Sequence, residues 1–106
     1  MVLVHPLDGR EEEWERWHRD HVLEVLRIPG FVSCRRFKVV DPQPSGRMPD
    51  WRFMVLYEIS SNDVAQCLAE LRRRVSDGEI KMTDASNPKR TVTLVWEPLS
   101  SHTAER

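Results

Sequence analysis

The sequence predicts an α+β domain whose elements follow the order strand, helix, strand, strand, helix, strand. Three observations support this prediction: short apolar runs typical of strands, two stretches whose apolar residues recur every three or four positions, and turn-forming residues between them. A chain of 106 residues has the length of one domain. We expect a single domain over residues 1–99 and a flexible C-terminal tail over residues 100–106.

The composition is that of a globular protein, with 40% hydrophobic and 31% charged residues. The net charge is −1 and charges of both signs are mixed along the chain, so no basic field favours nucleic acid. No apolar run approaches the length of a signal sequence or a membrane span. Cys34 and Cys67 are spaced neither as a disulfide framework nor as a metal knuckle. We therefore expect a cytoplasmic protein without nucleic-acid or membrane partners.

The first half of the chain predicts a strand over residues 2–5, a helix from about Arg10 to Arg27 and a second strand over residues 31–40. Pro29 and Gly30 end the helix. Residues 41–50 contain three prolines and a glycine, which predicts a loop. One face of the helix collects large side chains at 3- and 4-residue steps. They are Trp14, Trp17, His18, His21, Val25 and Ile28.

The second half predicts a strand over residues 51–59, a helix over 63–76 and a last strand over 91–96. Asp63 and the serines before it are suitable caps for this helix. Residues 79–90 have no regular pattern, and form either a flap over a pocket or a simple connection. The strand over 51–59 is apolar at both odd and even positions, which indicates that both of its faces are covered.

This order of elements is that of the ferredoxin-like βαββαβ fold, with a four-stranded antiparallel sheet. Two helices cover only one face of such a sheet. The other face needs a second cover, because leaving several large apolar side chains in water forfeits several kcal/mol of stability. A second copy of the sheet supplies that cover, so we expect a homodimer. The alternative is a monomer whose second face is partly hidden by the 41–50 loop and the tail.

Several segments resemble the EthD-like proteins of the dimeric α/β-barrel superfamily. The resemblance lies in Trp14, in the run Trp-His-Arg-Asp-His over residues 17–21, in Pro-Gly-Phe over 29–31 leading to Arg-Arg-Phe over 35–37, and in Leu-Tyr-Glu over 56–58. It extends over residues 2–98. The resemblance implies the dimeric α/β-barrel fold. It also implies a range of activities, which includes cofactor-independent lyases, isomerases, polyketide cyclases and monooxygenases, and haem-degrading enzymes.

His21 is the first candidate for a catalytic residue. It lies in the middle of the apolar helix face, where partial desolvation keeps an imidazole neutral and able to act as a general base. In the resemblance, His21 matches the helix histidine of EthD-like proteins. The alternative is a core histidine bonded to a backbone carbonyl or a buried hydroxyl. His18, one turn earlier, and Tyr57 on the third strand are the other catalytic candidates, with the role of orienting the substrate.

Indoles and a phenyl ring supply flat walls suited to an aromatic ligand, although each of them can equally fill the core. The candidate substrate-binding residues are Trp14, Trp17, His5, Trp51 and Phe53. Glu58 on the third strand predicts an ion pair with Arg35 or Arg36. Since no phosphate loop, nucleophile elbow or metal-ligand cluster is recognisable, we expect neither a cofactor nor a metal.

The residues and the resemblance together predict a small cofactor-independent enzyme. It would act by acid–base proton transfer, as an isomerase, cyclase, dehydratase or lyase, on a hydrophobic aromatic or polyketide-like molecule. The first alternative is a non-catalytic module that binds the same kind of ligand. The second is a cofactorless monooxygenase of the same fold.

Overall fold

A computed structural model describes the whole chain, residues 1–106, and has the predicted element order. The strands are β1 (Val2–Pro6), β2 (Phe31–Lys38), β3 (Phe53–Ile59) and β4 (Ser86–Thr93), and the helices are α1 (Glu11–Val25) and α2 (Val64–Ser76). The four strands form one antiparallel sheet in the order β2-β3-β1-β4. This is the ferredoxin-like arrangement, and it confirms the fold class predicted from the sequence.

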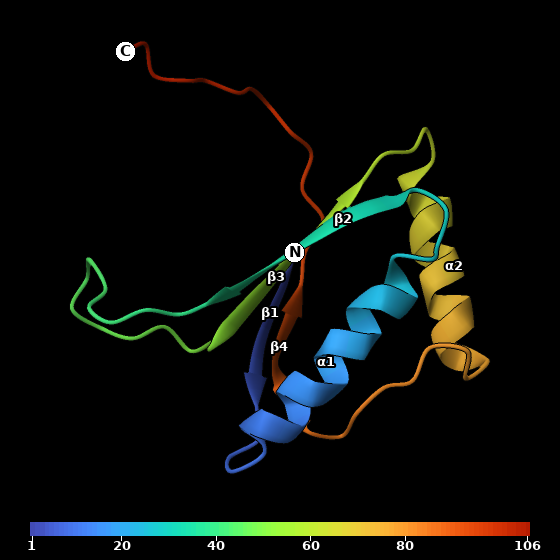
Figure 1. Cartoon of the computed structure of the whole chain (residues 1–106), viewed down its shortest axis with the longest axis horizontal. Coiled ribbons are helices and arrows are strands. Elements are labelled where there is room, and N and C mark those ends of the chain that lie inside the picture. Colours follow the sequence, from blue (N-terminus) through green and yellow to red (C-terminus); the bar gives the residue numbers. More distant parts are fainter.

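Both helices lie on the same side of the sheet (Figure 1). Side chains alternate between the two faces along each strand, so the strand register identifies the residues on the helix side. The pairs Val4 with Phe53 and Cys34 with Tyr57 lie on this inner face. Leu3 with Met54 and Ser33 with Glu58 lie on the outer face. No element of the chain covers the outer face (Figure 1).

The last strand begins earlier than the sequence predicts and ends before Trp96. It pairs with β1 from Ser86 to Thr93, with a register shift between Val4 and Pro6. Because Thr93 is paired with Val2, β1 ends at that point, and only two hydrogen bonds follow: Leu94 N–H donates to the Met1 carbonyl, and the N-terminal amine of Met1 donates to the Leu94 carbonyl. The predicted strand over residues 91–96 is therefore wrong in its bounds. Pro88 is accommodated because β4 is an edge strand.

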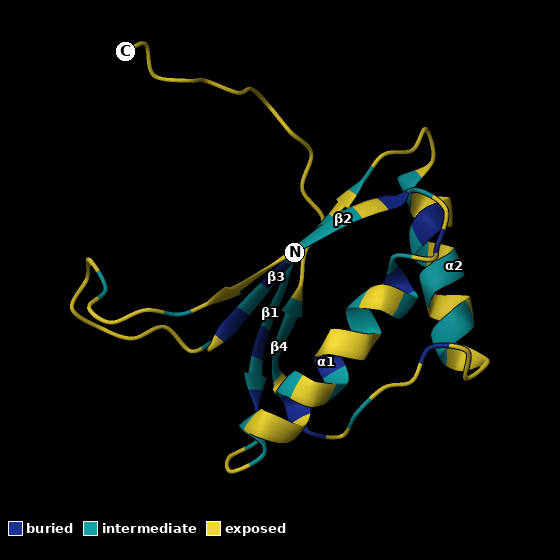
Figure 2. Ribbon diagram, in the orientation of Figure 1, coloured by how far each residue is buried: buried dark blue, intermediate teal, exposed yellow.

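The buried core is divided into two separate clusters (Figure 2). One lies at the start of α1 and consists of Val4, Trp14, Phe53 and Ala85. The other lies at the end of α1 and consists of Val25, Ile28, Phe31, Cys67 and Ile80. The helix is thus anchored to the rest of the domain at both ends, and the two clusters do not join beneath its middle.

The connection from α1 to β2 passes close to α2. Gly30 has φ +99°, a conformation that side-chain-bearing residues rarely adopt, and a Cβ at this position would lie 2.5 Å from Sγ of Cys67. The Cys67 thiol contacts the carbonyl of Pro29 at 3.4 Å. At the start of α2, the carboxylate of Asp63 accepts a hydrogen bond from the backbone N–H of Gln66 and caps the helix.

No regular structure follows Thr93, and the chain runs away from the domain toward its C-terminus (Figure 1). Leu94, Val95 and Trp96 are exposed at the start of this segment. Neither helix combines the length and the apolar character needed to traverse a bilayer.

Gly30 and Gly46 both have a positive φ, but another residue approaches closely only at Gly30. Alanine substitutions at the two positions should therefore differ in their cost in stability. We expect Gly30→Ala to destabilise the fold by about 2–4 kcal/mol, because the new methyl group adds overpacking against Cys67 to the backbone strain. Gly46→Ala is the matched control, since nothing lies within 4 Å of its Cβ, and it should cost only about 1 kcal/mol. Urea unfolding of both variants measures the difference. Equal losses would contradict the packing explanation.

Candidate functional site

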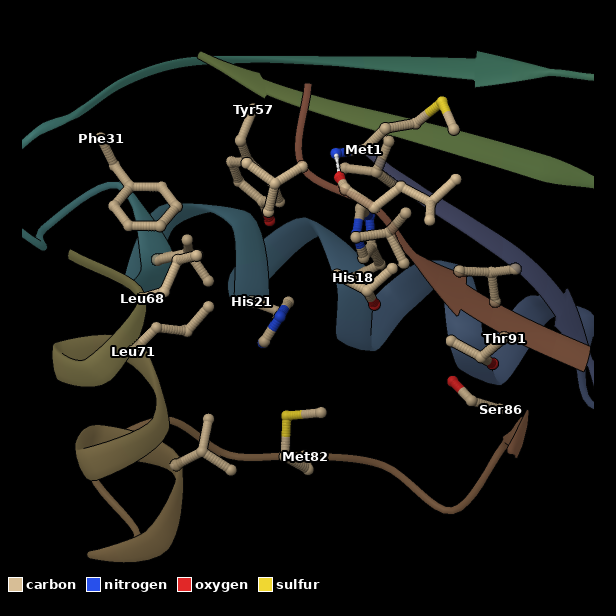
Figure 3. Close-up of a pocket in the computed structure, with 18 of the residues that line it drawn as sticks. Met1, His18, His21, Phe31, Tyr57, Leu68, Leu71, Met82, Ser86 and Thr91 are labelled. Atoms are coloured by element: carbon tan, nitrogen blue, oxygen red, sulfur yellow. Dashed lines mark hydrogen bonds between the residues drawn. The ribbon is translucent and has the colours of Figure 1, made fainter. Parts of the chain in front are cut away.

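A cavity of about 1100 Å³ lies between the helices and the inner face of the sheet. Its walls come from α1, α2, the inner face of the sheet, the segment around Met82 and the extended chain over residues 94–98 (Figure 3). Of the 30 residues that line it, 19 are hydrophobic. A volume of this size accommodates a small organic molecule. The cavity fills the space left between the two core clusters.

The middle of α1 contributes two histidines to this wall. The 3-residue spacing of His18 and His21 places both rings on the inner side of the helix, with centroids 5.9 Å apart. Each histidine is stacked on an indole of the same helix. Trp14 lies 4.5 Å from His18, and Trp17 lies 4.4 Å from His21. These stacks fix the planes of the imidazoles.

His18 is held as a neutral ring. It is only 4% exposed, and desolvation together with the nearby His21 lowers its pKa to about 4. Its Nδ1 accepts a hydrogen bond of 2.9 Å from Nε of Arg36, whose terminal nitrogen is paired with the carboxylate of Glu15. Because Nδ1 is an acceptor, the ring hydrogen must lie on Nε2. His18 is therefore a hydrogen-bond donor at Nε2.

His21 is less strongly held in its neutral form. Burial lowers its pKa, while Glu24 and a backbone hydrogen bond with Lys81 raise it. Trp17 also donates its indole N–H to the Lys81 carbonyl at 2.8 Å. Nδ1 of His21 is buried and has no hydrogen-bond partner. His21 thus lines the cavity with a carboxylate nearby that favours its protonated form.

Tyr57 reaches the cavity from β3, opposite the histidines (Figure 3). Burial raises the pKa of its phenol, and the neighbouring Cys34 thiol adds to that effect. The hydroxyl is buried without a hydrogen-bond partner. Tyr57 therefore stays protonated at neutral pH.

The structure brings together five of the residues selected from the sequence and leaves three outside the cavity lining. Trp14, Trp17, His18, His21 and Tyr57 all line it. His5 follows Val4 on β1 and so lies on the opposite face of the sheet, while Phe53 is packed in the core against Trp14. Trp51 precedes β3 and is also absent from the lining.

The predicted ion pair of Glu58 is wrong. Its carboxylate accepts a hydrogen bond from Ser33 on the outer face. Arg36 lies on the inner face and is paired with Glu15, and the guanidinium of Arg35 lies over the ring of Phe37. Glu58 is exposed rather than buried, so it does not need a charged partner.

Sequence reasoning missed Arg36 as part of the site. The available signal was the alternation of β2, which places Arg36 on the same face as Cys34 and hence toward α1. It also missed the wall formed by α2 and β4. Leu68, Leu71, Ser86, Thr91 and Thr93 belong to this wall. The strand predicted over residues 91–96 includes Thr91 and Thr93, but the start of β4 was missed because Pro88 and the charged residues that follow it conceal it.

The site contains groups suited to acid–base chemistry: one imidazole with a carboxylate nearby, one imidazole fixed as a donor and one protonated phenol. No group of three or more His, Cys, Asp or Glu side chains is arranged to hold a metal ion. Comparison with known proteins adds no assignment, since no family model matches the sequence and no curated protein or solved structure is significantly similar to it.

The low pKa of His18 predicts a specific loss of stability in acid. Unfolded His18 binds a proton near pH 6.5, whereas the folded ring does so only near pH 4. Stability from the neutral ring is complete above pH 6.5 and is lost as the pH falls toward 4, by about 3 kcal/mol in total.

Urea unfolding at roughly pH 7, 5.5 and 4 measures this loss, because these values span the interval between the pKa of the unfolded ring and that of the folded ring. We expect His18→Asn, whose side-chain oxygen can still accept the Arg36 bond, to have a correspondingly weaker acid dependence. His102→Asn is the control, because His102 lies exposed in the tail. A His18→Asn variant as acid-sensitive as the wild type would show that His18 is not held neutral.

Proposed function

We propose that this protein is a cofactor-independent enzyme that transfers a proton on a hydrophobic, aromatic or polyketide-like molecule bound in the cavity. The observation that carries the proposal is the imidazole of His21 in the wall of a largely apolar cavity, beside His18, whose hydrogen lies on Nε2, and the protonated Tyr57. A base in such a place gains from desolvation, and typically contributes about 10²–10⁴-fold to a rate.

In the proposed reaction, the imidazole of His21 removes a proton from a carbon next to a carbonyl group. The C–H bond breaks, its electron pair moves toward the carbonyl oxygen, and an enolate and an imidazolium form. His18 supplies a donor for the negative oxygen, and Glu24 favours the imidazolium. Return of the proton to another carbon gives isomerisation, and departure of a leaving group gives elimination or dehydration. These are the lyase, isomerase and cyclase types of chemistry.

The EthD-like resemblance of the helix motif supports the same proposal. The histidine that the motif would place at a ligand pocket is His21, and His21 lines the cavity. The alternative of a non-catalytic binding module uses the same cavity and the same donor. It differs only in that the bound ligand is released without chemical change.

The proposal is tested with 2-acetylnaphthalene, a flat hydrophobic ketone that has exchangeable hydrogens next to its carbonyl. In D₂O, we expect the protein to accelerate their replacement by deuterium, as followed by proton NMR. His21→Gln should reduce the acceleration by about 10²–10⁴-fold, because the base is lost. His5→Gln is the matched control, since His5 lies on the other face of the sheet, and it should exchange at the wild-type rate.

A His21→Gln variant that is folded by circular dichroism and exchanges as fast as the wild type would rule out His21 as the base. Stabilisation of the protein by the ketone, without any exchange above buffer, would favour the binding module instead.

We also propose that the protein is a homodimer joined through the outer face of the sheet. This face carries apolar side chains that are only partly buried in the single chain, among them Leu3, Met54, Leu56 and Val92. Phe37 adds a further exposed ring beside them. A two-fold contact would bury the same patch on both copies.

Sedimentation velocity tests the dimer. We expect Leu56→Arg, which places a charge in the middle of the outer face, to convert dimers to monomers. Leu23→Arg is the control, because Leu23 is already 61% exposed on α1 and should leave the dimer intact. A wild-type protein that sediments as a monomer at the highest soluble concentration would contradict the dimer.

A further inference from the structure

We propose that Arg36 is a positioning residue that, through His18, makes the cavity select hydrophobic ligands bearing a hydrogen-bond-accepting oxygen, such as a ketone or a deprotonated phenol. This inference rests on the proposed function and deepens it, since it names the ligand chemistry that the cavity prefers. It is carried by the hydrogen bond from Arg36 to His18 and by the unpaired Nε2 donor that this bond leaves on the cavity wall.

The first step is the orientation of Arg36. Its side chain lies on the inner face of β2, where it bridges α1 to the sheet. Nε donates to Nδ1 of His18 at 2.9 Å, and the other branch of the guanidinium is paired with Glu15. Since Glu15 and His18 are three residues apart on α1, one guanidinium holds two consecutive turns of that helix. The planar fork of arginine gives both bonds a defined direction.

The second step is the consequence for His18. An arginine donor excludes a hydrogen on Nδ1, so the ring hydrogen lies on Nε2, at the other side of the imidazole. No protein group accepts a bond from that nitrogen, and the ring belongs to the cavity wall. Stacking on Trp14, with an angle of 13° between the rings, prevents the imidazole from turning away. The cavity thus has a directed N–H donor.

The third step concerns the other unpaired groups of the wall. The indole N–H of Trp14, which is 1% exposed, has no partner, and neither has the hydroxyl of Tyr57. Both atoms are buried beneath the cavity surface, so neither contacts a ligand directly. Nε2 of His18 is therefore the unpaired donor that this mainly apolar wall offers to a ligand. A ligand that brings an accepting oxygen satisfies a donor that a hydrocarbon would leave unpaired.

The tautomer is tested by long-range ¹H–¹⁵N NMR at pH 7, a readout independent of activity. We expect His18 to show an acceptor-type Nδ1 and a protonated Nε2 in the wild type. Arg36→Met should give a mixture of tautomers, because the donor that excludes a hydrogen on Nδ1 is gone. Arg35→Met is the matched control, since Arg35 lies on the outer face, and it should retain the wild-type signals. A wild-type His18 with its hydrogen on Nδ1 would overturn the proposal.

The selectivity is tested with 2-acetylnaphthalene and 2-ethylnaphthalene, which have closely similar shapes but differ in the accepting oxygen. We expect the wild type and Arg35→Met to bind the ketone about 5–10-fold more tightly than the hydrocarbon, as measured by quenching of tryptophan fluorescence or by calorimetry. Arg36→Met should lose most of that preference while still binding the hydrocarbon. Equal affinities in the wild type, or a preference unchanged in Arg36→Met, would overturn the proposal.

Failure of this inference can be told apart from failure of the proposed function. A preference for the ketone that depends on Arg36, without deuterium exchange, would retain the donor role and reject the catalytic one. Exchange that depends on His21, without any preference or with the other His18 tautomer, would retain proton transfer and reject the role of Arg36.

Discussion

The structure depends on how α1 is attached to the sheet. The two ends of the helix are packed in core clusters, whereas its middle faces the cavity. Trp14 belongs to one core cluster and Val25 to the other. Between them the inner face of the helix carries His18 and His21, which cannot fill space as aliphatic side chains would. Protein interiors are normally packed to the density of organic crystals. The cavity of about 1100 Å³ is partly open to solvent, so its apolar walls lack the packing contacts that the two end clusters have.

The same attachment sets the charge state of the site. Burial alone would make both histidines poor bases, because each loses hydration on protonation. Their surroundings differ, however. His18 meets a guanidinium and a second imidazole, which both oppose a positive charge, while His21 has Glu24 and the Lys81 backbone near it. Two identical side chains on one helix face are thereby given different roles, one as a donor and one as a proton acceptor.

The fold and the centre of the site could be predicted from the sequence because they follow from local periodicity. The 3.6-residue repeat of α1 placed five of the cavity residues on one face, and the alternation of β3 separated Tyr57 from Glu58. Which of the two faced the helices could not be predicted, since both faces of β3 are apolar. The choice follows from the register with β1, a non-local pairing.

The residues that prediction misplaced share a cause in tertiary pairing. His5, Trp51 and Phe53 have side chains suited to a pocket, but their positions relative to α1 are set by strand pairing and by the core around Trp14. The bounds of β4 likewise depend on where β1 ends, which a window along the sequence does not contain. Arg35 or Arg36 was taken as a partner for Glu58 because they are charged and lie on the adjacent strand. Arg35 instead lies over the ring of Phe37, and Arg36 is on the other face from Glu58.

The two faces of β3 separate the candidate site from the contact surface of the proposed dimer. Val55 and Tyr57 line the cavity, whereas Met54 and Leu56 lie on the outer face. All the groups invoked for proton transfer come from the helix side of a single chain, so each subunit of a sheet-to-sheet dimer would hold a complete site. Pairing would then act on the site through the rigidity of the sheet. Such a dimer stabilises a domain with a divided core without adding a residue to its chemistry.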